Sequence, residues 1–415
     1  MKGIFKKIGL FAMGLILSLS YSVPTASAAP LWTVTTGTGP HGVVVDGSGN
    51  IYVTNFDAKQ LQKFNSAGAL QWTVSTGTYS YGVATDGSGN IYVTSYGGAK
   101  LFKYNSSGTL QWSRGIGTYG VAVDGSGYIY ITSGTTTFSK YNNAGTLLDT
   151  ETTASGAHGV ATDASGNVYV ACYTAKQLQK YNSTGTLQGW VSTVNYPENV
   201  AVDRSGNIYV TCTGQLRKYN SSLALQWTST IGNTSYGVAT DASGNIFVSN
   251  YSDNTLQKFN SAGVLSGTLT TGTGPRGAAT DGSGNVYVAN YSANTLQKFP
   301  PICNGPVTIN WNESITAATT SIRGAHIAEL RTQVNNRRAD AGLSAYPWTV
   351  PTLPTGTIPF IDTYINELRT GISGVYTQCG WSAPSFTTDP TITPGVTPVK
   401  AAHINELRSK ASAAP

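Results

Sequence analysis

The chain has 415 residues and a formal net charge of +6, and only 11% of its residues are charged, compared with ~25% in typical domains. A content of 40% apolar and 10% aromatic residues is enough to bury a core, which excludes a disordered chain. The 48 glycines, together with abundant Thr, Ser and Asn, exclude a coiled coil or helical repeat and favour strands joined by turns.

The first 28 residues have the layout of a secretory signal peptide. Three lysines lie within the first seven residues, the apolar run Ile8–Leu19 follows, and Ala26-Ser27-Ala28 ends the segment. The apolar run is too short to span a bilayer comfortably, and the final tripeptide is the A-x-A pattern of a cleavage site. We expect cleavage before Ala29 and a secreted or cell-envelope protein without a transmembrane segment. The alternative is an uncleaved membrane anchor.

Charge and cysteine content narrow the class of partner further. Cleavage would leave 22 basic and 19 acidic residues, an excess too small and too dilute to indicate nucleic-acid binding. The four cysteines are an even number, and an oxidising compartment would allow them to form disulfides.

One motif, GVVVDGSGNIYVTN around Asp46, recurs through two thirds of the chain. Its aspartate returns at spacings of 40, 38, 39, 40, 38 and 40 residues, at Asp86, Asp124, Asp163, Asp203, Asp241 and Asp281. Each unit holds four strand-like runs, of which GVAVD, NIYVT and LQKFN are three and LQWTV is the fourth. Four short strands per ~40 residues are the period of a propeller blade.

The two ends of the repeat region indicate a closed ring. The last unit stops at Lys298-Phe299-Pro300 without a fourth strand, whereas the chain begins with a spare strand, LWTV, at 31–34. Closure would remove strand edges that could otherwise pair with other chains. The sequence therefore predicts an all-β seven-bladed β-propeller over 29–299, closed by an N-terminal strand.

The pattern G-V-A-x-D-x-S-G-N-I-Y-V followed by L-Q-K-F resembles the NHL repeat family of propellers, and the resemblance covers all seven units. That family usually carries Asp directly after its Y-V-A/T, so contacts that the family makes through this Asp are not expected here. The position is filled by a polar residue or cysteine in every unit: Asn55, Ser95, Ser133, Cys172, Cys212, Asn250 and Asn290.

Two charged positions recur in every unit, and we interpret both as structural. The motif aspartate is expected to cap its turn through an Asx hydrogen bond. A calcium site is disfavoured because Gly47 and Gly49 supply no side-chain oxygen. The third strand of each unit carries a lysine that is expected to maintain the blade: Lys63, Lys103, Lys140, Lys180, Lys218, Lys258 and Lys298.

Residues that differ between the units are the candidate ligand-binding residues. The first strand begins, and the second ends, at the same end of a blade, so two rings of side chains are expected to line one mouth of the channel. The first ring is the residue before GVA in each unit: His41, Tyr81, Tyr119, His158, Glu198, Tyr236 and Arg276. The second ring is the residue after Y-V-A/T in each unit, from Asn55 to Asn290 as given above. The first ring suits a polar ligand, with tyrosine faces for stacking and His, Glu and Arg for hydrogen bonds. The alternative is a plug of side chains that bond to one another.

Blades four and five hold a cluster of His158, Cys172, Glu198 and Cys212, all expected at the same mouth. Two thiolates, an imidazole and a carboxylate are legitimate ligands for a divalent metal such as zinc. Equivalent positions on neighbouring blades in an oxidising compartment instead favour a Cys172–Cys212 disulfide, if their Cα atoms approach ~4.4–6.8 Å. Two free buried thiols are the third alternative.

A short motif and the mouth histidines frame a catalytic alternative. The tetrapeptide GPHG at 39–42 resembles a motif of the streptogramin B lyases, a family of similar propellers. That resemblance implies a catalytic base at the mouth, His41 or His158, with Glu198 near it and a bound divalent metal. The three-histidine zinc site of amidating lyases is not expected, because the predicted propeller holds only these two histidines.

The composition changes after 300–302, which we interpret as a linker to a helical module over 303–415. The motif HIAELR at 326–331 returns as YINELR at 364–369 and HINELR at 403–408. Apolar residues around the second motif recur at helical spacing, so we expect three helices packed through the Ile and Leu of each motif. The Glu and Arg of each motif are two apart and do not face each other on one helix; they are expected to bridge between helices.

Cys303 and Cys379 bracket the first two helices and are expected to form a disulfide. His326 and His403 occupy equivalent motif positions, where packed or surface histidines are expected rather than a metal pair. The module resembles repeated C-terminal modules of secreted bacterial proteins with an HINELR-type motif. This resemblance assigns no activity, and attachment to an envelope or partner is the hypothesis.

The sequence thus predicts a secreted, non-enzymatic binding or scaffold protein whose propeller mouth binds a glycan, a peptide or an envelope protein without a cofactor. The first alternative is a lyase or hydrolase with His41 or His158 as base. The second is a structural envelope component without a defined site. They rank in this order because a fold alone does not assign an activity.

Overall fold

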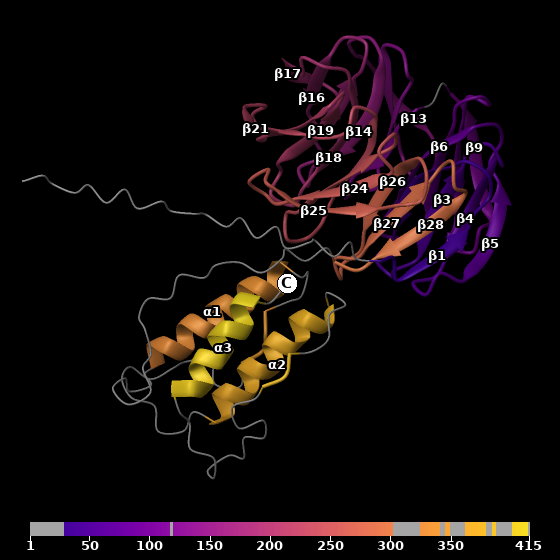
Figure 1. The fold of residues 1–415 in the computed structure, drawn as a ribbon. Coiled ribbons are helices and arrows are strands. Elements are labelled where there is room, and N and C mark those ends of the chain that lie inside the picture. The colour runs from indigo at the N-terminus through magenta and orange to yellow at the C-terminus, as the bar shows by residue number, and fades with distance from the viewer. Residues whose placement is uncertain are drawn as a thin grey trace, which may run out of the picture.

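The repeat region folds into seven four-stranded antiparallel sheets arranged as blades around a ring (Figure 1). The predicted seven-bladed propeller is therefore confirmed. The computed structural model describes residues 29–116, 119–301, 324–340, 345–348, 362–378, 384–386 and 401–413.

The strands of each blade follow one another in sequence from the channel outward. Blade one holds β2 (Pro40–Val45), β3 (Ile51–Asn55), β4 (Gln60–Phe64) and β5 (Leu70–Ser75). Blade two holds β6 (Ser80–Thr85), β7 (Ile91–Ser95), β8 (Lys100–Tyr104) and β9 (Leu110–Gly115). Blade three holds β10 (Val121–Val123), β11 (Ile129–Thr132), β12 (Thr137–Tyr141) and β13 (Leu147–Thr152). Blade four holds β14 (Ala157–Thr162), β15 (Val168–Cys172), β16 (Gln177–Tyr181) and β17 (Leu187–Ser192).

Blade five holds β18 (Pro197–Val202), β19 (Ile208–Cys212), β20 (Gln215–Tyr219) and β21 (Leu225–Thr230). Blade six holds β22 (Ser235–Thr240), β23 (Ile246–Asn250), β24 (Thr255–Phe259) and β25 (Leu265–Thr270). Blade seven holds β26 (Pro275–Thr280), β27 (Val286–Asn290), β28 (Thr295–Phe299) and, outermost, β1 (Trp32–Thr35). The N-terminal strand therefore closes the ring, with Trp32 opposite Lys298 and Thr35 opposite Thr295.

The core consists of layers between neighbouring blades. The second strand of every blade is buried along its whole length, because each sheet packs face to face with the next. In one layer, Val43 and Val53 of blade one pack with Ala279 and Tyr287 of blade seven. Ring closure thus buries apolar side chains that come from opposite ends of the repeat region.

The motif aspartate organises the turn between the first and second strands. One carboxylate oxygen of Asp46 accepts the N–H groups of Ser48 and Asn50, each at 2.9 Å. The other accepts the Asn50 side-chain amide at 2.8 Å and the Tyr52 hydroxyl at 3.0 Å. This is the predicted Asx cap, extended by a hydrogen bond from the buried tyrosine.

The recurrent lysines connect one blade to the next. The ammonium of Lys63 donates to the Ser106 carbonyl in blade two at 3.1 Å, and the Trp72 indole donates to the same oxygen at 3.3 Å. Lys298 of blade seven donates to the Ser66 carbonyl of blade one at 3.4 Å. The lysine position therefore contributes to the contact between blades, as predicted for a structural residue.

Three helices follow the propeller: α1 (Gly324–Asp340), α2 (Asp362–Gln378) and α3 (Ala401–Ala413). Each contains one copy of the repeated motif, and the motif Ile and Leu of all three are fully buried: Ile327, Leu330, Ile365, Leu368, Ile404 and Leu407. The predicted three helices and their packing residues are confirmed. Cys303 and Cys379, and the side chains of His326 and His403, lie outside the described residues.

The Glu and Arg of the three motifs form a cycle of ion pairs between helices. Arg331 of α1 lies 3.2 Å from Glu367 of α2. The cycle continues from Arg369 of α2 to Glu406 of α3 at 3.6 Å. It closes from Arg408 of α3 to Glu329 of α1 at 2.9 Å. The prediction that these residues bridge between helices is correct. Each helix is paired with both of the others through the Glu and Arg of its motif.

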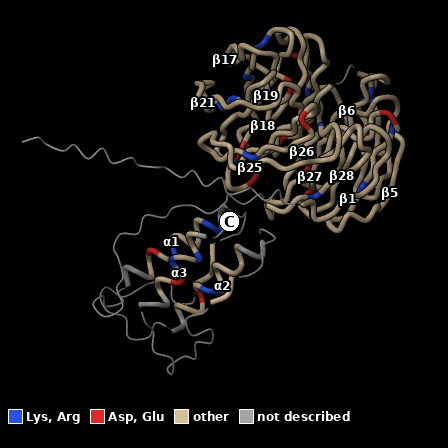
Figure 2. Tube along the Cα trace, viewed as in Figure 1, with Lys and Arg blue, Asp and Glu red and all other residues tan. Residues whose placement is uncertain are grey.

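Charged residues are sparse and of both signs along the traced chain (Figure 2). Among the described segments, none of the helices has the length and apolar character that a membrane crossing requires.

Candidate functional site

The start of the first strand places one side chain of each blade at the channel mouth. In six blades the ladder between the first and second strands is irregular there, for example between Pro40 and Val43 in blade one. In blade three, Tyr119 lies two residues before the strand β10. A bulge of this kind re-aims a side chain, and here it turns the residue before the repeat glycine toward the channel.

In six blades a glycine follows the mouth residue and allows neighbouring blades to approach closely; in blade five Asn199 takes its place. A Cβ added to Gly42 would lie 2.8 Å from the Tyr81 carbonyl oxygen, and one added to Gly277 would lie 2.5 Å from the His41 carbonyl oxygen. The Thr54 hydroxyl supports this contact, because it accepts the Gly42 N–H at 2.9 Å and donates to the Tyr81 carbonyl at 3.0 Å. The backbone that carries the mouth residues is thus held by the adjacent blade.

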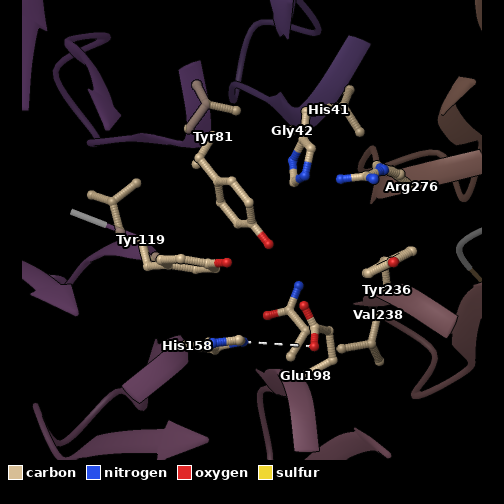
Figure 3. Close-up of a pocket in the computed structure, with 18 of the residues that line it drawn as sticks. His41, Gly42, Tyr81, Tyr119, His158, Glu198, Tyr236, Val238 and Arg276 are labelled. Carbon is tan, nitrogen blue, oxygen red and sulfur yellow. Dashed lines mark ion pairs between the residues drawn. The ribbon is translucent and has the colours of Figure 1, made fainter. Parts of the chain in front are cut away.

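The structure brings all seven residues of the first predicted ring to one cavity of about 220 Å³. Figure 3 shows His41, Tyr81, Tyr119, His158, Glu198, Tyr236 and Arg276 directed around this cavity. The volume is below the ~300–1,000 Å³ of pockets for drug-sized ligands. The mouth therefore has room for a small molecule or a single chemical group.

The prediction of the second ring is wrong, because none of its residues lines this cavity. The blades are radial, so side chains of the second strand point into the spaces between blades and not toward the channel axis. Asn55 is fully buried and donates to the Gln62 side chain at 2.9 Å. Asn290 likewise donates to Gln297 at 3.0 Å.

The residues that do lie beside the first ring are those that directly follow the members of the predicted second ring in the sequence. They follow the end of the second strand and are aromatic in five blades: Phe56, Tyr96, Tyr173, Tyr251 and Tyr291. Tyr96 packs edge-on against Tyr119 with ring centroids 5.3 Å apart, and Tyr173 stacks on His158 at 4.7 Å. The recurrence of an aromatic residue at this position was the sequence signal that could have identified these residues as part of the mouth.

The aromatic rings of the mouth pack against one another, tilted for His41–Tyr81 and Tyr81–Tyr119 and stacked for Tyr119–His158. The ring centroids are 4.0 Å apart for His41 and Tyr81, 4.4 Å for Tyr81 and Tyr119, and 4.3 Å for Tyr119 and His158. The rings of the wall are therefore in contact with one another from His41 to His158. The hydroxyl groups of Tyr81 and Tyr119 point toward the centre of the cavity (Figure 3), so the wall offers hydrogen bonds.

His41 is an uncharged part of this wall. Only 7% of the residue is exposed, and burial together with the nearby Arg276 guanidinium lowers the pKa of His41 to about 3. Its imidazole is therefore neutral at pH 7, and its Nε2 atom is buried without a hydrogen-bond partner. A group with this pKa is a weak general base at neutral pH.

The cavity holds two opposite charges that do not pair with each other. The Arg276 guanidinium lies over the rings of Tyr291 at 4.3 Å, Tyr236 at 4.7 Å and Tyr251 at 5.3 Å. No carboxylate in the described part of the chain lies within 4.0 Å of it. The Glu198 carboxylate lies 3.6 Å from Nδ1 of His158.

Cys172 and Cys212 are both free, buried thiols, so of the three alternatives the structure has the third and not the disulfide. They end second strands and are buried in the layers between blades, in separate apolar clusters. Burial raises the pKa of both thiols to about 12, which keeps them protonated. The four-residue metal cluster is not formed either: no group of three His, Cys, Asp or Glu side chains suited to a metal occurs among the residues described.

Two family models match the repeat region. The model of the NHL repeat matches residues 38–64, and the model of a beta-propeller repeat, SBBP, matches residues 71–103. No curated protein sequence is significantly similar to the chain.

Solved structures of similar fold are propellers of very different sequence. A streptogramin B lyase matches with a TM-score of 0.59 and 14% identity, over 64% of this chain and 96% of that one. Hydrazine synthase of Kuenenia stuttgartiensis matches with a TM-score of 0.58 and 13% identity, over 64% and 97%. A virginiamycin B lyase from Staphylococcus aureus gives 0.58 and 12%, also over 64% and 97%. At this identity the likeness concerns the fold alone.

Proposed function

We propose that this NHL-repeat propeller is a secreted binding protein whose channel mouth binds a small polar group that carries a carboxylate. The observation that carries the proposal is the position of Arg276. It lines the small cavity at the mouth, is held by three tyrosine rings, and has no carboxylate partner among the described residues. A guanidinium in this setting is suited to a carboxylate, with which it forms short charge-assisted hydrogen bonds.

The groups around Arg276 support an anion rather than a cation or an apolar ligand. Burial raises the pKa of Tyr81 well above its ordinary value, so its hydroxyl remains a proton donor at neutral pH. The hydroxyl of Tyr119 also points toward the centre of this cavity (Figure 3). Two hydroxyl donors and a cation around 220 Å³ match the acceptor oxygens of a carboxylate.

The proposal is tested by comparing carboxylates with their neutral amides. Thermal stabilisation and calorimetry of the full chain would be measured with matched pairs such as propionate and propionamide, or alanine and alaninamide. Hydrogen bonds to a charged group contribute ~1.5–3 kcal/mol, so the acid should bind about tenfold tighter or more. Arg276→Gln should abolish this preference. The exposed Arg204, at the opposite end of the channel, gives the control variant Arg204→Gln.

Equal binding of acid and amide, or a preference that survives in Arg276→Gln, would contradict the proposed function. Arg276→Gln loses the contacts of the guanidinium with three tyrosine rings. Circular dichroism and the unfolding transition therefore establish that the variant is folded before its binding is measured.

A second candidate function is a lyase or hydrolase with His158 as general base. The supporting observation is the 3.6 Å approach of the Glu198 carboxylate to Nδ1 of His158, since a carboxylate beside an imidazole can orient it for proton transfer. His41, with its lowered pKa, is the poorer base. Turnover of ester or lactone substrates that is lost in His158→Gln and retained in His41→Gln would support this function over simple binding.

Secretion belongs to the same proposal. Residues 1–28 would be removed on export, and the module over 303–415 would hold the propeller at an envelope or partner. The intact mass of exported protein tests the first statement. A chain that begins at Ala29 supports export with cleavage, whereas a chain that retains the first 28 residues indicates an uncleaved anchor.

A further inference from the structure

We infer that the mouth selects a zwitterion, a small ligand of the α-amino-acid class whose ammonium group faces Glu198 while its carboxylate faces Arg276. The inference rests on the proposed function and names the ligand class of that site. It follows from two opposite charges that line one small cavity without touching each other.

Within the described residues, no carboxylate pairs with Arg276, and the contact of Glu198 is with a titratable histidine. Arg276 has aromatic rings as neighbours, at 4.3–5.3 Å. For Glu198, the ion-pair contact found within the described ranges is His158, whose ring carries a charge only when protonated. The cavity therefore presents one positive and one negative group that a ligand can reach separately.

Glu198 and Arg276 both influence the pKa of the same two tyrosine hydroxyls, so both charges lie near the same part of the cavity. Burial is the main reason why the pKa values of Tyr81 and Tyr236 are raised. Glu198 raises both further, and Arg276 lowers both. Figure 3 shows the Glu198 carboxylate and the Arg276 guanidinium on different sides of the cavity into which the Tyr81 hydroxyl points.

Charge complementarity distinguishes a zwitterion from other small ligands. Two charges that are partly removed from water and do not pair lose hydration without a compensating attraction. A lone carboxylate would satisfy Arg276 but bring a like charge toward Glu198, and a lone amine would do the reverse. An α-amino acid, which carries both groups on one carbon atom, offers an opposite charge to each of them.

The remaining polar atoms fit the same ligand. The Nε of Arg276 and Nε2 of His41 are buried without partners, and so is Nδ1 of His158 beside Glu198. The N–H at Nε of Arg276 can donate to a carboxylate. The ring nitrogens of His41 and His158 that lack partners can accept a hydrogen bond from an ammonium group when they carry no proton. The cavity size of about 220 Å³ favours a free amino acid, with its side chain directed out of the mouth, over a larger ligand.

The first experiment is a thermal-shift screen of the full chain with the twenty free amino acids, each beside the corresponding acid without the amino group where one is soluble. We expect at least one amino acid to stabilise the protein. If none of the twenty does so, the inference is refuted. Calorimetry then compares the best amino acid with its des-amino acid and its amide, for example alanine with propionate and alaninamide.

Two variants separate the two charges. Glu198→Gln should reduce the affinity for the amino acid about tenfold or more, to that of the des-amino acid, and leave des-amino acid binding unchanged or tighter. Arg276→Gln should abolish binding of both. Asp149→Asn, an exposed carboxylate on the outer strand β13, is the matched control and should change neither.

The two levels of the account can fail separately. If the des-amino acid binds as tightly as the amino acid and Glu198→Gln changes nothing, the zwitterion is refuted while the carboxylate site stands. If acids bind no better than amides and Arg276→Gln has no effect, the carboxylate site is refuted as well. Glu198→Asp, which keeps the charge, should retain part of the preference and shows that loss in Glu198→Gln is not a loss of folding.

Discussion

Replacing Tyr52 by Phe removes one hydrogen bond from the turn cap of blade one, and blade six already lacks the same bond. The Tyr52 hydroxyl donates to the Asp46 carboxylate at 3.0 Å. At the equivalent position blade six has Phe247, and its aspartate, Asp241, accepts the side-chain amide of Asn245 at 2.8 Å. The protein therefore supplies both the test site and a reciprocal one, Phe247→Tyr.

The expected magnitude follows from the nature of the acceptor. A hydrogen bond to a charged group contributes ~1.5–3 kcal/mol when it is buried. Because Asp46 is partly exposed, we expect Tyr52→Phe to lower the free energy of unfolding by about 1–2 kcal/mol at pH 7. Phe247→Tyr should raise it by a similar or smaller amount. Urea unfolding monitored by circular dichroism and tryptophan fluorescence measures both.

The effect of Tyr52→Phe should depend on pH with a definite sign. Burial alone would raise the pKa of Asp46, but hydrogen bonds from Asn50, Tyr52 and Ser48 outweigh it and lower the pKa below its ordinary value. A carboxyl group with a lowered pKa stabilises the fold above its unfolded-state pKa, and this contribution is lost as the pH falls through the folded-state pKa. The difference between wild type and Tyr52→Phe should therefore shrink in acid. A difference that is absent at pH 7, or that grows as the carboxylate is protonated, would refute this reasoning.

Three further predictions concern blade contact, the helices and the thiols. Gly277→Ala should lower the free energy of unfolding of the propeller by about 2 kcal/mol or more, since its Cβ would lie 2.5 Å from a carbonyl oxygen of the next blade. In the same urea unfolding assay, the control Gly47→Ala should be near neutral, because its Cβ would have nothing within 4 Å. Glu367→Gln should lower the stability of the helices by about 3 kcal/mol, because it removes one partner of a buried ion pair; loss of helical circular dichroism on heating measures this, and an unchanged transition would contradict it. Cys172 and Cys212 should resist a thiol reagent at pH 8 in the native protein and react after denaturation; rapid native labelling, read by peptide mass spectrometry, would show that they are not buried.

The fold was predictable because each blade repeats the same local information. The regular spacing of the motif aspartate fixes four strands per unit, and the spare strand before Thr35 can only pair with the incomplete last blade. The cycle of ion pairs in the helices was also predictable in outline, since Glu and Arg two residues apart cannot meet on one helix. The order of the pairs, from Arg331 to Glu367 and onward, depends on helix packing that the motif does not encode.

The candidate site was predictable to the level of one ring and no further. Strand direction alone places His41 and Arg276 at the same mouth, and the structure has both at the cavity. The prediction of the second ring was wrong because it assumed that side chains at the end of the second strand face the channel. The blades are radial, so the side chains of Asn55 and Cys172 point into the spaces between sheets. The packing of the Tyr81 ring between those of His41 and Tyr119 depends on the spacing of blades, which one blade's sequence does not contain.

The most direct test of the account is a structure of the full chain with the best-binding amino acid from the screen. The account predicts that the ligand occupies the cavity at the channel mouth, with its carboxylate within hydrogen-bond distance of Arg276 and its ammonium group beside Glu198. A ligand bound at the outer strands, or one in the cavity with no contact to Arg276, would contradict the central claim that this guanidinium is the anion-binding group.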